Sequence, residues 1–146
     1  MPGYVRWSRV AFNVLAWLFA ASVGFQVYLA GLAVFAGEGF ASHRDFGYAI
    51  ALLPLVMLVL ALLARAGRAV IGAILLIFVL FILQSVFVVL WKSNPPMPAA
   101  AAIHPLNGFV IGLVAVWIAW RTRGYLSTLA ARSETPGSEA ANRTTS

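Results

Sequence analysis

The stretch AVIGAILLIFVLFILQSVFVVLW, residues 69–91, is almost uniformly aliphatic or aromatic, and its polar interruptions are Gln84 and Ser85. A helix rises about 1.5 Å per residue, so a block of this length matches the roughly 30 Å hydrocarbon core of a bilayer. Apolar runs of about 18 residues or more are typical of membrane-spanning helices. This stretch therefore predicts a transmembrane helix.

Turn-forming segments bound this block on both sides. Residues 65–68 form a basic turn before it, and three prolines exclude a helix from residues 92–98 after it. Pro54 predicts a kink within another apolar block, whereas Pro105 suits the first turn of a helix. Three further spans are expected, at about residues 10–36, 43–64 and 105–120.

The composition supports this membrane class. Hydrophobic residues make up 62% of the 146 residues and charged residues 10%, against about 25% charged in soluble domains. Cysteine is absent, which excludes disulfides and thiolate-ligated metals. The fold class predicted is an all-α membrane protein. Residues 1–125 form a four-transmembrane-helix bundle, and the polar residues 126–146 are expected to be a disordered tail.

The positive charges predict the orientation. Arg44 and Lys92 lie on one side of the predicted membrane. The other eight lie together on the opposite side: Arg6, Arg9, Arg65, Arg68, Arg121, Arg123, Arg132 and Arg143. By the positive-inside rule both termini are cytoplasmic, in a multi-pass protein of the plasma membrane. Because the net charge of +6 sits at span ends, nucleic-acid binding is disfavoured.

Two segments of the chain resemble each other. HRDFGYAIA begins at His43 and HPLNGFVIG at His104, and these are the only two histidines. Each histidine is preceded by a span that carries one glutamine, Gln26 or Gln84. The chain therefore reads as two helical hairpins of the same orientation, related as a parallel repeat about the membrane normal. Such symmetry predicts that the two imidazoles face each other at the outer ends of their spans.

This pairing suggests a cofactor site. Neutral imidazole is a common haem ligand, so His43 and His104 are candidate axial ligands of haem b iron. Gly47 and Gly108 lie on the same helical faces and leave room for a porphyrin, while Arg44 is placed to pair with a propionate. The alternative is that both histidines only contact headgroups at helix starts. A divalent metal is disfavoured because two histidines without a third ligand make a poor site.

The two glutamines are expected to face the bundle interior, where a polar group needs a partner. Interhelical hydrogen bonding is their default role. By helical rise, Gln26 and Gln84 are expected too far below the outer helix ends to touch a histidine ring directly.

Three segments carry a resemblance to known proteins. Residues 26–32, 43–47 and 104–107 are similar to motifs of small, uncharacterised four-span membrane proteins from high-GC bacteria. More distantly, the layout resembles one four-helix half of haem A synthase, whose histidines near the outer ends of its second and fourth helices hold haem. That resemblance implies haem ligation by His43 and His104. It does not imply catalysis, because Phe40 stands where that enzyme has its glutamate.

Three functions follow as hypotheses. The first is a small membrane haem b protein for electron transfer or redox sensing, whose partners are the lipid bilayer and a redox partner or membrane complex. The second is a non-enzymatic accessory or structural subunit without cofactor. The third is a haem- or quinone-linked membrane enzyme that depends on a partner. The sequence favours a non-enzymatic role, because no catalytic triad, P-loop or intramembrane carboxylate is present.

Overall fold

A computed structural model describes residues 1–126, and these residues form α-helices and one short 3-10 helix without a strand. Four helices, counting α2 and α3 as one, are long and apolar enough to cross a membrane. This confirms the predicted all-helical membrane architecture, and residues 127–146 of the predicted tail lie outside the described residues. The elements are α1 (Gly3–Phe35), α2 (Ala41–Ile50), α3 (Leu53–Leu63), α4 (Arg68–Trp91), α5 (Pro98–Arg121) and η1 (Arg123–Tyr125).

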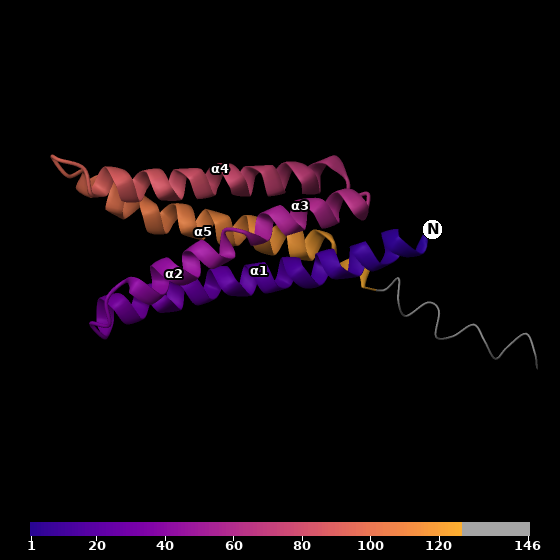
Figure 1. The fold of residues 1–146 in the computed structure, drawn as a ribbon, viewed down its shortest axis with the longest axis horizontal. Coiled ribbons are helices and arrows are strands. Elements are labelled where there is room, and N and C mark those ends of the chain that lie inside the picture. The colour runs from indigo at the N-terminus through magenta and orange to yellow at the C-terminus, as the bar shows by residue number, and fades with distance from the viewer. Residues whose placement is uncertain (127–146) are drawn as a thin grey trace, which may run out of the picture.

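The predicted kink at Pro54 is confirmed. Proline has no N–H to donate and its ring crowds the carbonyl four residues earlier, which here belongs to Ile50. α2 ends at Ile50, and α3 begins at Leu53 with Pro54 in its first turn. Figure 1 shows the consequence, because α2 lies along α1 while α3 turns toward α4.

The last helix begins earlier than expected. α5 starts at Pro98, so Pro105 lies inside the helix and not in its first turn, and the predicted start near residue 105 is wrong. The reason is local, because Pro98 suits the first helical position and the alanines that follow are the strongest helix formers. Pro105 removes one backbone hydrogen bond from the helix, and inside a membrane bundle neighbouring groups can satisfy the carbonyl that this frees. The first helix likewise begins at Gly3, before the expected start of its span.

The densest packing lies in the half of the bundle near the N-terminus. There α1, α3, α4 and α5 form a closed ring of contacts. Arg9 Nε donates to the Ala64 carbonyl at 3.1 Å, and its guanidinium lies 5.1 Å from the ring centre of Tyr125. Both ends of the described chain therefore meet at one end of the bundle, called the basic end below. The largest fully buried side chains include Phe12, Phe19, Met57, Ile74, Ile77 and Ile118.

The opposite half of the bundle is built differently. There α2 packs against α1, and α4 packs against α5, while α2 and α4 have no substantial contact with each other. Figure 1 shows the α1–α2 hairpin and the α4–α5 hairpin diverging toward this end, called the histidine end below. At the histidine end, contact between the two hairpins therefore depends on side chains that α2 and α5 direct toward each other.

Candidate cofactor site

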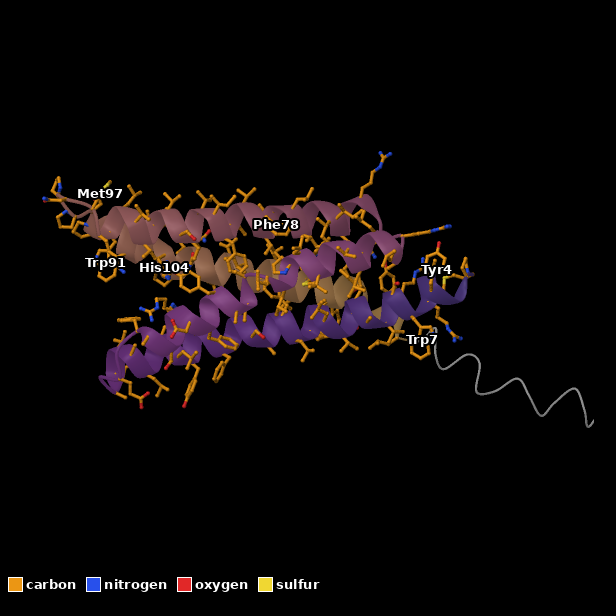
Figure 2. The ribbon with its side chains drawn as sticks, viewed as in Figure 1. Tyr4, Trp7, Phe78, Trp91, Met97 and His104 are labelled. Carbon is orange, nitrogen blue, oxygen red and sulfur yellow. The ribbon has the colours of Figure 1, made fainter. Side chains whose placement is uncertain are left out.

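The two histidines come together between the hairpins. His43 lies in the first turn of α2 and His104 in the second turn of α5, and their ring centroids are 6.1 Å apart. The ring planes are inclined by 63°, and both side chains are partly buried. Figure 2 shows His104 toward the end that carries Trp91 and Met97, far from Tyr4 and Trp7 at the basic end. The structure therefore brings together the two residues that the repeat singled out.

His43 is held by the backbone of α1. Its Nδ1 lies 3.1 Å from the carbonyl oxygen of Gln26. A carbonyl oxygen can only accept, so the neutral imidazole must carry its proton on Nδ1. Its Nε2 then carries the lone pair, which is the form in which histidine binds a metal.

His104 is held by side chains of its own hairpin. Its Nε2 lies 3.1 Å from Nε2 of Gln84 on α4. Asn107, one turn further along α5, is buried, and its amide donates both to the Leu80 carbonyl at 2.9 Å and to Oε1 of Gln84. This pattern joins α4 to α5 through one connected set of polar groups.

The Leu80 carbonyl decides the direction of every bond in that set. Because it only accepts, the Asn107 nitrogen must face it, and that nitrogen also donates to the Gln84 oxygen. The Gln84 nitrogen is then left to donate to Nε2 of His104. We therefore assign His104 the same Nδ1-protonated form as His43, with its lone pair on Nε2.

The contact between Gln84 and His104 corrects a prediction. Both glutamines were expected too deep to reach a histidine ring. Because α5 begins at Pro98, His104 lies six residues inside its helix, about 9 Å from its end, and Gln84 lies at a similar depth before Trp91. The two side chains therefore meet across the α4–α5 hairpin.

Glutamine side chains lie beside the two candidate glycines. A Cβ atom added to Gly47 would lie 2.6 Å from Nε2 of Gln26, and one added to Gly108 would lie 3.5 Å from Nε2 of Gln84. The glycines were expected to leave room on the histidine faces. In this structure the side-chain amides of Gln26 and Gln84 occupy the space beside these glycines.

Two polar atoms in this layer have no hydrogen-bond partner although they are buried. They are Nδ1 of His104 and Oε1 of Gln26, and two of the four such atoms among the described residues lie here. An unpaired buried polar group costs about 1–3 kcal/mol, so native structures hold few of them. The other two such atoms, Nε of Arg6 and Oδ1 of Asn13, lie at the basic end.

A haem held by two histidines requires a defined separation between the two imidazole rings. A metal–nitrogen bond is about 2 Å long and an imidazole nitrogen lies about 1 Å from its ring centre, so two axial rings have centroids about 6 Å apart. The observed separation is 6.1 Å. Both assigned tautomers also present Nε2 as the donor atom. The ring separation and the proton placement match such a group, while Nε2 of His104 is hydrogen-bonded to the Gln84 amide in this structure.

The remaining candidate, Arg44, lies outside the histidine contact. It forms an ion pair with Asp45 at 2.8 Å, and both side chains are largely exposed. Among the described residues no group of three or more His, Cys, Asp or Glu side chains is close enough to hold a metal ion.

The sequence shows Asn107 only as the end of the motif at residues 104–107, yet in the structure it orients the Gln84 amide that contacts His104. Its signal was available, because a buried amide at bilayer depth needs partners. Asn13 is a second case, at the basic end, where its amide donates to the Ala119 carbonyl at 2.9 Å and to Thr122 Oγ1 at 2.8 Å. Both asparagines join α5 to another helix.

Comparison with known proteins returns one family. Residues 26–90 match a family model described as a family of unknown function, DUF6220. The matched region includes Gln26, His43 and Gln84 and ends before His104. No curated protein and no solved structure matches the chain. These comparisons do not include haem A synthase.

Proposed function

We propose that this chain is a small integral membrane protein that binds haem b between His43 and His104 and serves in electron transfer or redox sensing. The observation that carries the proposal is the 6.1 Å separation of the two ring centroids, contributed by two different hairpins. Side chains on facing helices are a common way to build a cofactor site in a helical bundle.

The protein's own groups would hold the haem and orient its ligands. The Gln26 carbonyl fixes the proton of His43 on Nδ1, a second contact of the kind that orients metal-ligating histidines. When bound, haem b supplies one-electron chemistry at an iron held by two imidazoles. In this proposal Arg44, the neighbour of His43 in α2, would exchange its exposed ion pair with Asp45 for a propionate.

The proposal includes an orientation. The arginines of the basic end predict that this end faces the cytoplasm, with both termini there and the histidine pair in the outer half of the membrane. The correspondence of Gln26, His43 and Gly47 with Gln84, His104 and Gly108 supports a parallel repeat of two hairpins. A haem at this depth would exchange electrons with a partner on the outer side.

The test is a reduced-minus-oxidised visible spectrum of the purified protein, expressed with ample haem. We expect a sharp Soret and alpha band in the wild type that both His43→Ala and His104→Ala abolish. Ser85→Ala is the matched control, because the Ser85 hydroxyl bonds only to the Phe81 carbonyl of its own helix at 3.2 Å. A folded wild type without visible bands would refute the proposal.

A second candidate is an accessory membrane subunit without cofactor. It is favoured by the hydrogen bonds that the histidines already make, since His43 joins α2 to α1 and His104 joins α5 to α4. In that case His43→Ala and His104→Ala would lower the stability of the colourless protein and change no spectrum.

A further inference from the structure

The two candidate ligand atoms are not equally accessible. Nε2 of His43 has no hydrogen bond among the described residues, whereas Nε2 of His104 accepts from the Gln84 amide at 3.1 Å. A lone pair cannot bind iron and accept this hydrogen bond at the same time. One of the two ligands is therefore covered.

We propose that Gln84 is a displaceable cap on His104: in the cofactor-free protein its amide fixes the imidazole as the Nδ1-protonated form and protects the Nε2 lone pair, and it withdraws when iron binds. The iron-binding half of this inference rests on the proposed haem function. The tautomer half does not, because it concerns the protein without cofactor.

The cap is built from a side chain, and this distinguishes the two ligands. His43 is positioned by a backbone carbonyl of α1, which cannot move without moving the helix. His104 is positioned by an amide at the end of a flexible, partly buried side chain. The Gln84 amide can therefore leave Nε2 by a side-chain rotation.

Asn107 makes the cap directional. It holds the Gln84 oxygen, while the Leu80 carbonyl holds Asn107. If the Gln84 amide were turned over, its nitrogen would face the Asn107 nitrogen, and two donors would oppose each other. Asn107 is thus a positioning residue that acts on His104 through Gln84.

The tautomer is measured first, by nitrogen NMR of the haem-free protein labelled with ¹⁵N-histidine, at a pH where both imidazoles are neutral. We expect a protonated Nδ1 and an unprotonated Nε2 on His104 in the wild type. In Gln84→Leu we expect a mixture of both tautomers. A wild-type His104 protonated on Nε2, or a tautomer balance that Gln84→Leu leaves unchanged, would overturn the cap.

The same variants are then titrated with haem. Because binding no longer has to break a hydrogen bond of ordinary net strength, Gln84→Leu should bind haem about 2-fold to 10-fold more tightly than the wild type. Equal or weaker binding would overturn displacement. Ser85→Ala is the matched control, since it changes the neighbouring residue of α4, whose hydroxyl donates to the Phe81 carbonyl of its own helix at 3.2 Å.

The two readouts separate the proposals. If no variant binds haem, the proposed function fails and the NMR experiment alone decides whether Gln84 caps His104. If haem binds equally to the wild type and Gln84→Leu, the haem proposal stands and displacement of the cap is refuted.

Discussion

The two glycines beside the histidines provide a matched pair for a stability experiment. Replacing glycine by alanine inside a helix gains about 1 kcal/mol, because alanine loses less backbone entropy on folding. At Gly108 the new Cβ would lie 3.5 Å from Nε2 of Gln84, an ordinary contact. Gly108→Ala should therefore stabilise the protein by about 0.5–1 kcal/mol.

At Gly47 the same substitution meets an obstacle. Its Cβ would lie 2.6 Å from Nε2 of Gln26, closer than nonbonded atoms approach, so the glutamine must move. Nε2 is the far end of a flexible side chain, so the cost lies at the low end of the overpacking range, about 1 kcal/mol, and roughly cancels the helix gain. We therefore expect Gly47→Ala to be less stable than Gly108→Ala by about 1 kcal/mol.

The assay is reversible unfolding in mixed micelles of increasing SDS content, followed by the fluorescence of the five tryptophans. Gly72→Ala is the open-space control, because no atom lies within 4 Å of its added Cβ. A Gly47→Ala protein as stable as Gly108→Ala would show that the Gln26 amide does not lie against Gly47. If haem uses the space beside both glycines, both variants lose haem affinity and only Gly108→Ala gains stability.

Three further substitutions test the packing and polar contacts. Asn13→Ala removes two buried hydrogen bonds, to the Ala119 carbonyl and to Thr122 Oγ1, and should destabilise the protein by about 1–3 kcal/mol. Its control is Ser22→Ala, because the Ser22 hydroxyl donates to the Leu18 carbonyl of its own helix. This control should change stability by less than about 0.5 kcal/mol. Ala115→Leu places a large side chain at a fully buried position and should lower the free energy of unfolding by about 1–3 kcal/mol. Val116→Leu changes the exposed neighbouring residue and should leave stability unchanged. Equal effects in the same unfolding assay would contradict the burial of Ala115 and the exposure of Val116. Asn107→Leu should leave the Gln84 amide free to turn, so His104 should show mixed tautomers by NMR, and an unchanged tautomer would show that Asn107 does not act on it.

The helices of this chain follow from local properties of the sequence. In a bilayer no water is present to satisfy the backbone, so an apolar block such as residues 69–91 can only be a helix. The break before Pro54 and the turns at residues 64–67 and 92–97 follow from proline and charge in the same local way, although Arg68 and Pro98, expected in these turns, begin α4 and α5. The start of α5 was also readable locally, but Pro105 was given the role that Pro98 plays.

The candidate site was only partly predictable for a different reason. The repeat pointed to His43 and His104 because their segments share a pattern. It could not show that Gln84 bonds His104, because that contact depends on how far each helix of the hairpin extends. It could not show that Gln26 holds His43 through its carbonyl, or that Gln amides lie beside Gly47 and Gly108.

These contacts were decided by the register of one helix against another. Lipid tails are as apolar as leucine, so hydropathy identifies a spanning helix without specifying which face meets its neighbour. In this protein a few buried polar side chains, such as Asn13 and Asn107, form hydrogen bonds that join α5 to α1 and α4 in the observed register. Hydropathy therefore determined the four spans, and interhelical hydrogen bonding determined where the two histidines meet.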